Sequence, residues 1–326
     1  MIIISLKVLN LVLRFISYGV IKLKQKRFLG LLIVLIISTL VSFLALNPID
    51  RFETRTARPW MKEVSDDYLI KQMSIPGTHD SGATHSIFDV AGKCQDLRIQ
   101  SQLNIGVRFF DLRLQLVGDE FRIIHGPVDQ KLKFKSVLKD LTSFIKKYDS
   151  EFLIVSIKQE DSSINNTRSF EEVLKENLDE FSDYISFDKE LPSLVKEARG
   201  KIHILSRHYL DFGYPSYSGW MDDTTFTLGE LYVQDNYCID SIEEKKEDIK
   251  STINRSNDVS NDKLVINFTS CYLDNAFPPS YAGTAAKYIN PWFNDYIKEH
   301  DDFKLGVVVS DFINKEIAEL IYRRNY

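Results

Sequence analysis

Nine side chains of the sequence have the types and spacing needed for acid–base chemistry on a phosphate ester. Two are histidines, four are aspartates and three are cations, and each lies at or near the end of a short apolar run: His79, Asp80, Asp111, Arg113, His125, Lys158, Arg207, Asp235 and Asp311. A buried strand seldom ends in a charge without reason, because an unpaired buried charge is costly. We therefore expect these side chains to share one polar pocket.

The chemistry open to this set is proton transfer around a phosphate. Histidine is the side chain best matched to proton transfer near neutral pH, and two of them can divide the work of base and acid. Neighbouring carboxylates fix the histidine tautomer, and Arg113 offers a planar fork for phosphate oxygens. No serine or cysteine is placed to act as a covalent nucleophile, so the set predicts phosphodiester cleavage by water or by a hydroxyl of the substrate.

Metal binding is the competing use of the carboxylates. Four of them could hold calcium or magnesium through oxygen ligands: Asp80, Asp111, Glu160 and Asp235. Arg113 and Lys158 would share the same pocket, and their fixed charges would repel a metal ion. The residues therefore favour a site without a metal.

Short runs rich in Val, Ile and Phe predict the strands that position these residues. There are eight runs, the number that closes a small barrel: 70–75, 107–113, 121–125, 152–158, 201–206, 230–235, 263–269 and 305–311. Helical spacing appears between several of them, at 133–148, 170–181 and 291–298. The run 121–125 follows its predecessor after a short turn, so those two could instead form an antiparallel hairpin. The pattern predicts an α/β fold, a distorted or incomplete TIM (β/α)8 barrel, with the site at the carboxyl ends of its strands.

The N-terminal region differs in composition from the rest of the chain. Residues 28–46 are 19 uncharged and mostly apolar positions, long enough to cross a bilayer as a helix, and four basic residues precede them. By the positive-inside tendency the remainder of the chain is exported. We expect a basic region at 1–27, an uncleaved transmembrane anchor or else a signal segment at 28–46, a linker at 47–60 and a single catalytic barrel at 61–326.

Charge and cysteine content narrow the function further. Residues 1–58 carry nine Lys/Arg against two Asp/Glu, a balance of +7, so the remainder carries −12 to give the total of −5. An acidic body of this kind is unsuited to nucleic acid, which needs clustered cations. The three cysteines, Cys94, Cys238 and Cys271, match no zinc-binding spacing.

Blocks of sequence around these residues resemble the bacterial phosphatidylinositol-specific phospholipase C family. The resemblance covers about residues 65–320, with the blocks in the family's order. They are SIPGTHDSG at 74–82, CQDLRIQSQLNIGVRFFDLRL at 94–114, IIHGP at 123–127, LIVSIKQE at 153–160, GKIHILSR at 200–207, YVQDNY at 232–237, YAGTAAKYINPWFNDYI at 281–297 and VVVSDFIN at 307–314.

The resemblance implies a role for each catalytic residue. His79 would be the general base that takes the proton from the inositol 2-hydroxyl, and Asp311 would orient it. That hydroxyl would attack phosphorus, forming a cyclic inositol phosphate and releasing diacylglycerol. His125 would be the general acid that protonates the glycerol oxygen, assisted by Asp80.

The resemblance also implies how the substrate is held. Arg113 would bind the phosphate in the place that calcium takes in eukaryotic relatives, with Asp111 supporting it, so no metal and no cofactor is expected. Lys158, Arg207 and Asp235 would hold inositol hydroxyls, and Tyr237 would stack on the ring. The implied partner is a phospholipid membrane containing phosphatidylinositol or glycosyl-phosphatidylinositol, and the protein would be a monomeric, exported bacterial enzyme.

Two other functions stay open at this point. One is a metal-dependent phosphodiesterase of the glycerophosphodiester type, which metal dependence would distinguish. The other is a non-catalytic module that binds membrane surfaces, which loss of His79 or His125 would mark. Both histidines are present.

Overall fold

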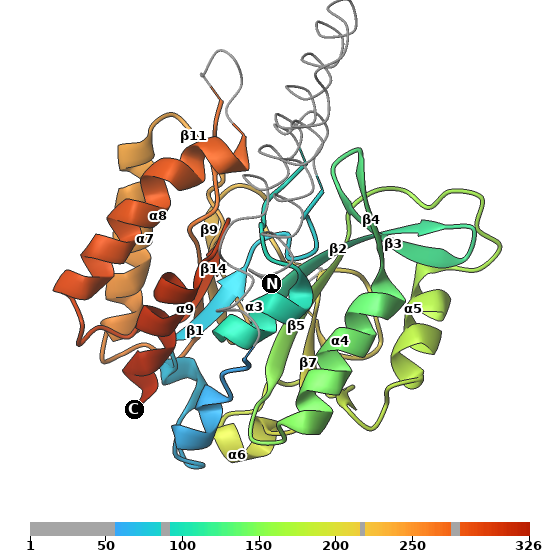
Figure 1. Ribbon diagram of the computed structural model, residues 1–326, viewed down its shortest axis with the longest axis horizontal. Helices are drawn as coiled ribbons and strands as arrows, with labels where there is room; N and C mark the ends of the chain where they lie inside the picture. Colours follow the sequence, from blue (N-terminus) through green and yellow to red (C-terminus); the bar gives the residue numbers. More distant parts are fainter. Residues whose placement is uncertain (1–55, 86–91, 216–218, 275–280) are drawn as a thin grey trace, which may run out of the picture. The chain divides into compact units, whose positions relative to one another are not determined.

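The computed structural model describes residues 56–85, 92–215, 219–274 and 281–326 (Figure 1). The segment 28–46, predicted to be an anchor or signal, lies outside these residues, as do residues 1–27 and most of the predicted linker. Within the described residues, no helix has the length and apolar character needed to span a bilayer.

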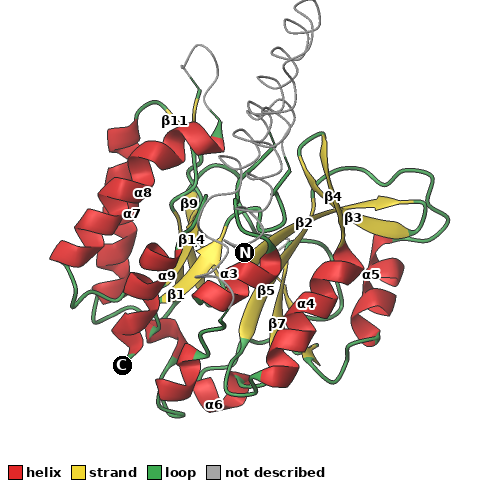
Figure 2. Ribbon diagram, in the orientation of Figure 1, coloured by secondary structure: helices red, strands yellow, loops and turns green. Residues whose placement is uncertain are grey.

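One curved sheet forms the centre of the region from residue 75 onward (Figure 2). Its core strands run parallel and pair in the order β7 (Ile202–Ser206), β5 (Leu153–Gln159), β2 (Phe109–Val117), β1 (Ile75–Thr78), β14 (Val307–Ser310), β12 (Leu264–Phe268) and β10 (Leu231–Gln234). Short strands extend the two ends: β6 (Ile185–Ser186) and β8 (Tyr214–Pro215) pair with β7, and β9 (Thr225–Leu228) pairs antiparallel with β10. Among the described residues no pairing joins β7 to β10. The barrel is therefore incomplete, which is one of the two alternatives, distorted or incomplete, that the sequence predicts.

The run 121–125 is not a barrel strand, which corrects the count of eight. It forms β3 (Glu120–His125), which pairs antiparallel with β2 and continues into β4 (Val128–Lys133). Gly118 and Asp119 have φ of 57° and 58°, the left-handed pair of a two-residue hairpin turn. A turn this short leaves no room for a crossover helix, so the chain must reverse. The first run is also displaced, because residues 70–72 form a 3-10 turn and the strand begins at Ile75.

Helices cover the outside of the sheet (Figure 2). They are α3 (Ile99–Ile105), α4 (Phe134–Lys147), α5 (Phe170–Asp179), α6 (Val195–Ala198), α7 (Ile242–Asn257), α8 (Ala282–Glu299) and α9 (Lys315–Tyr322), with 3-10 turns η3 (Trp60–Glu63), η4 (Ile70–Gln72) and η5 (Arg323–Asn325). Two short strands, β11 (Cys238–Ile239) and β13 (Tyr272–Leu273), form a separate pair. The predicted helices at 133–148 and 170–181 are confirmed as α4 and α5.

Helix α8 begins nine residues before the predicted start at Pro291, which therefore lies inside the helix. Proline there removes one internal N–H···O bond. The buried face nevertheless continues on both sides of it, through Ala285, Ile289, Phe293 and Ile297. All four side chains belong to one hydrophobic cluster, and this burial outweighs the loss of one hydrogen bond.

Side chains alternate between two hydrophobic clusters along the strands. Phe109, Ile154 and Val309 belong to the cluster inside the curved sheet, whereas Phe110 and Val155 belong to the cluster between sheet and helices. This alternation follows from the two-residue period of a strand. Both faces are buried, so the strands read as continuous apolar runs.

A buried ion pair fixes the first described segment to the sheet. Arg108 and Glu151 have fully buried side chains, and Nε of Arg108 donates to Oε2 of Glu151 at 2.7 Å. The other carboxylate oxygen accepts from the backbone N–H of Met61 at 2.9 Å. Arg108 also donates to the carbonyl oxygen of Arg58 at 2.5 Å.

Replacing Glu151 with alanine is expected to lower the free energy of unfolding by about 3–5 kcal/mol, because the Arg108 charge stays buried without its partner. Urea unfolding measures this change. The control is Glu180→Ala, which removes the exposed pair with Lys135 and is expected to change stability by about 0.5 kcal/mol or less. If Glu151→Ala lowers the free energy of unfolding by less than about 1 kcal/mol, the Arg108–Glu151 ion pair does not stabilise the fold.

Candidate active site

The turn after β1 presents the first two candidate residues, His79 and Asp80. Asp80 adopts φ of 43°, and the turn is tied to β2 because Asp111 donates its N–H to Oγ of Ser81 at 2.8 Å. Gly77 lies just before the turn, where an added Cβ would come within 3.0 Å of Cβ of Phe109. Close packing of β1 on β2 therefore requires glycine at this position.

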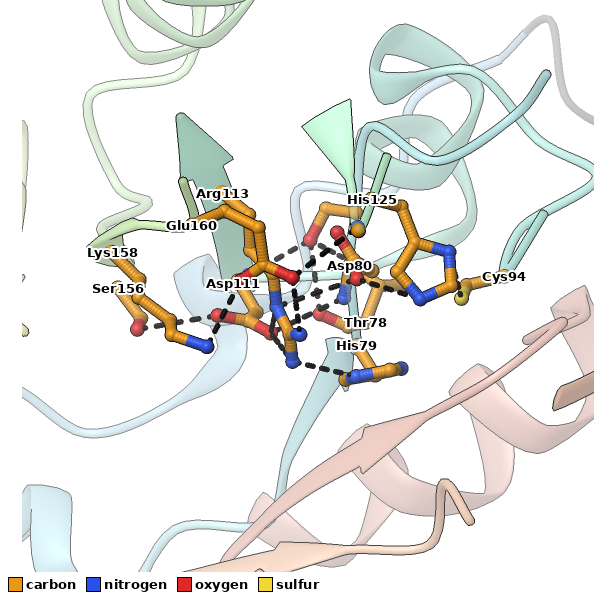
Figure 3. Close-up of polar contacts among 12 residues, drawn as sticks. Thr78, His79, Asp80, Cys94, Asp111, Arg113, His125, Ser156, Lys158 and Glu160 are labelled. Carbon is orange, nitrogen blue, oxygen red and sulfur yellow. Dashed lines mark hydrogen bonds and ion pairs between the residues drawn. The ribbon is translucent and has the colours of Figure 1, made fainter. Parts of the chain in front are cut away.

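His79 is held from both sides of its ring. Its Nδ1 lies 2.8 Å from Oδ1 of Asp311. Its Nε2 lies 2.7 Å from Nη2 of Arg113, and Figure 3 shows this second contact. Asp311 reaches His79 because β1 and β14 are parallel neighbours with Thr78 opposite Ser310. Burial disfavours the charged imidazolium, but the Asp311 carboxylate outweighs it, so the pKa of His79 is raised above its ordinary value.

Arg113 lies among three carboxylates. Its Nε is 3.2 Å from Oδ2 of Asp111 and 3.3 Å from Oδ2 of Asp80, and its Nη1 is 3.4 Å from Oε1 of Glu160. Burial disfavours the charged guanidinium, but these carboxylates overcome it and hold the pKa of Arg113 well above its usual range. The guanidinium therefore provides a fixed positive charge at the centre of the site.

The carboxylates around Arg113 respond differently to their surroundings. Burial works against ionisation of Asp111, yet Arg113 and Arg207 lower the pKa of Asp111 below its ordinary value. Burial likewise opposes ionisation of Glu160, and Arg113 and Lys158 lower its pKa to about 2. Burial dominates at Asp80, whose pKa is raised. Asp80 thus differs from Asp111 and Glu160 in the direction of its pKa shift.

Asp80 lies beside the second histidine, His125. Oδ2 of Asp80 is 3.6 Å from Nε2 of His125, and neither Asp80 oxygen has a hydrogen-bond partner among the described residues. His125 ends β3, and its ring lies beside Asp80 and Cys94 (Figure 3). The rings of His79 and His125 are 6.5 Å apart and nearly perpendicular. Both imidazoles can therefore reach oxygens of one phosphodiester.

A second group of predicted residues continues the pocket. Nζ of Lys158 is 2.9 Å from Oε2 of Glu160, which joins Lys158 to the Arg113 cluster. Nη1 of Arg207 is 3.6 Å from Oδ1 of Asp111, and its Nη2 is 4.0 Å from Oδ2 of Asp235. The structure therefore brings nine of the ten predicted site residues into one connected polar network.

The tenth residue, Tyr237, follows Asp235 by two positions but makes other contacts. Its hydroxyl donates to Oδ1 of Asp222 at 2.9 Å, and its ring lies 5.9 Å from the ring of Tyr272. No contact found among the described residues joins the Tyr237 side chain to the other nine.

Two residues of the network were not predicted as substrate-binding. The sequence suggests Glu160 only as a metal ligand, although Glu160 follows Lys158 by two residues and so lies on the same side of the extended chain. Trp220 donates Nε1–H to Oδ2 of Asp235 at 3.1 Å, and its ring lies 4.0 Å from the guanidinium carbon of Arg207. Core packing is the default interpretation of a tryptophan. The sequence signal for Trp220 is its place in an aromatic segment, 214–220, that carries proline and glycine between two predicted strands.

One group of side chains in the described residues has the types and spacing of a metal site. His79, Asp80 and Cys94 offer ligand atoms within 4.8 Å of one another. Nη2 of Arg113 already lies 2.7 Å from Nε2 of His79. Metal binding at this point would have to overcome the repulsion of a fixed guanidinium charge.

Comparisons with known proteins agree with this geometry. Residues 73–208 match the family model described as phosphatidylinositol-specific phospholipase C, X domain. The 1-phosphatidylinositol phosphodiesterase of Staphylococcus aureus (strain Newman) is 28% identical over 281 residues, which cover 79% of this chain and 89% of the relative. The protein of the same name from Listeria monocytogenes is 25% identical over 294 residues, covering 83% of this chain and 86% of the relative.

Solved structures show the same fold. A mutant of the phosphatidylinositol-specific phospholipase C from Staphylococcus aureus superposes with a TM-score of 0.72 at 26% identity, covering 80% of this chain and 94% of that one. The Listeria monocytogenes enzyme gives a TM-score of 0.68 at 22% identity, covering 84% and 99%. With the X-domain match and the curated relatives, this shows that the chain belongs to the bacterial phosphatidylinositol-specific phospholipase C family.

Proposed function

We propose that this chain cleaves phosphatidylinositol into diacylglycerol and inositol 1,2-cyclic phosphate without a metal ion. The observation that carries the proposal is the position of the Arg113 guanidinium, 2.7 Å from the His79 ring and 3.3 Å from the Asp80 carboxylate that lies beside His125. A base, an acid and a fixed cation therefore surround one space. The names of the relatives, 1-phosphatidylinositol phosphodiesterases, supply the substrate.

In the proposed reaction His79 acts as the general base. It takes the proton of the inositol 2-hydroxyl, and that oxygen forms a bond to phosphorus. Asp311, 2.8 Å from Nδ1, orients the ring and stabilises the imidazolium that results. The nucleophile belongs to the substrate itself, so reaction is intramolecular and the product is a cyclic phosphate.

His125 acts as the general acid in the same reaction. The bond between phosphorus and the glycerol oxygen breaks, and His125 gives its proton to that oxygen, releasing diacylglycerol. Asp80 supports His125 because its buried carboxyl group lies 3.6 Å from Nε2. One proton enters the enzyme at His79 and one leaves at His125, so the enzyme's net charge is unchanged.

Arg113 stabilises the phosphate as charge grows on its non-bridging oxygens. Its carboxylate partners fix it in place before the substrate binds, so little reorganisation is needed during the reaction. Asp111 is a positioning residue in this scheme, because it contacts both Arg113 and Arg207.

The inositol ring would be held by the second half of the network. Lys158, Arg207 and Asp235 are proposed to bind its hydroxyls, with Glu160 as a further acceptor and Tyr237 stacking on the ring. Nη1 of Arg207 is buried and has no hydrogen-bond partner among the described residues. It can therefore donate a hydrogen bond to a bound ligand.

We also propose that the enzyme is exported and acts on membranes as a monomer. The apolar segment 28–46 and the basic residues before it support export, with 28–46 serving as a membrane anchor or as a signal segment. Glycosyl-phosphatidylinositol is the second proposed substrate, because it presents the same phosphodiester and the same inositol 2-hydroxyl.

The proposed base predicts a specific pH dependence. A general base must be unprotonated in the free enzyme, so kcat/KM rises as the pH passes the pKa of His79. Burial acts to lower that pKa, whereas Asp311 raises it and prevails, so Asp311→Asn is expected to move the acid limb of the profile to lower pH while reducing the maximal rate. The control is Asp129→Asn on the β3–β4 hairpin. An acid limb that stays in place would mean that the group titrating there is not His79.

A substrate panel tests the proposed function. The full-length chain is incubated in excess EDTA with micelles of phosphatidylinositol or phosphatidylcholine, or with soluble glycerophosphoinositol, and release of diacylglycerol, glycerol or glycerol 3-phosphate is measured. Diacylglycerol from phosphatidylinositol, and none from phosphatidylcholine, is expected. Release of glycerol 3-phosphate or glycerol from glycerophosphoinositol that requires added calcium or magnesium, without diacylglycerol from phosphatidylinositol, would instead indicate a metal-dependent glycerophosphodiesterase. No turnover under any of these conditions would contradict the proposed activity.

A further inference from the structure

Lys245 is a fully buried lysine to which the proposed reaction assigns no role. It lies in the second turn of α7, and its side chain faces the end of β10. Its ammonium group donates to Oε1 of Gln234 at 2.9 Å and to the backbone carbonyl oxygen of Asn236. Burial lowers the pKa of Lys245, because the charged form loses its hydration.

The contacts of Lys245 are unusual because they involve neutral oxygens. None of the ion pairs found among the described residues includes its Nζ atom. Cys271, Asp235, Asp248 and Asp311 raise the pKa of Lys245 without forming an ion pair with it, and burial outweighs them. A buried ammonium with no carboxylate in direct contact costs stability. The direct contacts of Lys245 are therefore the place to look for its role.

These contacts hold the turn that carries two proposed head-group residues. Asn236 stands between Asp235 and Tyr237, and its carbonyl oxygen binds Lys245. Its backbone N–H donates to Oε1 of Gln234 at 2.8 Å, which is the oxygen that Lys245 also contacts.

Helix α7 also fixes the side chain of Asn236. Nδ2 of Asn236 donates to Oδ2 of Asp248 at 2.9 Å. Lys245 and Asp248 thus hold both the backbone and the side chain of one residue. Asp235, whose carboxylate contacts Trp220 and lies 4.0 Å from Arg207, directly precedes the residue fixed in this way.

We propose that Lys245 is a positioning residue for recognition of the inositol head group. Its buried ammonium group binds the backbone carbonyl oxygen of Asn236 and thereby fixes the Asp235–Tyr237 turn. Asp235 then meets the ring hydroxyls in a fixed position. The inference rests on the proposed function, because it assigns Asp235 and Tyr237 to the head group. It adds a residue that does not itself touch the substrate.

The effect should appear in binding rather than in the chemical step. In the proposed complex Asp235 binds the same ring hydroxyls, and Tyr237 stacks on the same ring, in the ground state and in the transition state, so loosening them removes uniform binding. Such a loss raises KM and leaves kcat nearly unchanged. A residue with only a structural role would lower the amount of active enzyme, and therefore apparent kcat, without changing KM.

The test compares Lys245→Met with Lys250→Met on the same helix, where Nζ of Lys250 pairs with Glu247. Full-length wild type and variants are assayed on a soluble short-chain phosphatidylinositol, and myo-inositol is titrated as a competitor. Lys245→Met is expected to raise both KM and the inhibition constant of myo-inositol about tenfold, a loss of about 1.4 kcal/mol. Its kcat should stay within about threefold of wild type, and Lys250→Met should match wild type throughout.

A second variant guards against misfolding of the first. Asp248→Ala removes the contact with the Asn236 side chain from a half-buried position and is expected to raise KM about threefold. If folded Lys245→Met has the KM and the myo-inositol inhibition constant of wild type, the inference is overturned. If Lys245→Met does not fold, the same result for Asp248→Ala overturns it. A fall in kcat at constant KM would overturn it too. If wild type itself does not cleave the lipid, the proposed function fails instead, and the two failures are thus distinguishable.

Discussion

Replacing His79 with alanine is expected to lower kcat on phosphatidylinositol by about 10²–10⁴-fold, the usual contribution of a general base. The loss should be near the upper end, because the Asp311 carboxylate 2.8 Å from Nδ1 is then left buried without its partner. Initial rates on phosphatidylinositol micelles in EDTA measure it, and circular dichroism checks that the fold is intact. KM should change little, since the proton moves only in the chemical step.

The matched control is His300→Ala. His300 lies at the end of α8 and packs against Tyr296 and Phe303, away from the polar network. Its loss should leave kcat within about twofold of wild type. Turnover of folded His79→Ala close to that of wild type would eliminate His79 as the base.

Replacing Arg113 with lysine is expected to lower kcat by about 10²–10³-fold, similar to removing one donor from an oxyanion hole. The guanidinium contacts Asp80, Asp111 and Glu160 at 3.2–3.4 Å while presenting a further nitrogen toward His79. A lysine ammonium is a single compact charge and cannot contact all of these groups at once. Transition-state stabilisation should fall even though the positive charge is kept.

The control for this prediction is Arg122→Lys on the exposed hairpin, where Arg122 pairs with Asp129. Full activity is expected from it in EDTA. A second substitution, Arg113→Asp, should abolish metal-free turnover and open a site for calcium among the carboxylates. Undiminished metal-free activity of Arg113→Asp would show that Arg113 does not stabilise the transition state.

Most of the site residues could be predicted from the sequence to lie together, because the central strands of the sheet are parallel. Charged residues at the ends of parallel strands must meet at one edge, and the register of Thr78 against Ser310 brings His79 beside Asp311. The same reasoning placed Arg207, which directly follows β7. Asp111 and Arg113 instead lie within β2, which continues to Val117, but they follow the point at which its neighbour β1 ends. The reasoning failed for the run 121–125, where the two-residue turn at Gly118 and Asp119 overrides the tendency of an apolar run to join the barrel.

Contacts made by loops and by helix interiors could not be predicted in this way. Trp220 reaches Asp235 from a loop, and no spacing rule fixes where a loop residue points. Lys245 lies within an acidic and basic stretch that is typical of a solvated helix face. Its position four residues before buried Ile249 was the available signal, since both lie on one side of α7.

Phosphorus NMR of the full-length chain with phosphatidylinositol micelles in excess EDTA tests the central claim most directly. The resonance of inositol 1,2-cyclic phosphate should appear as that of the lipid declines, because His79 activates the internal 2-hydroxyl and Arg113 replaces a metal. A spectrum that stays unchanged in EDTA, with turnover appearing only after calcium or magnesium is added, would contradict the account.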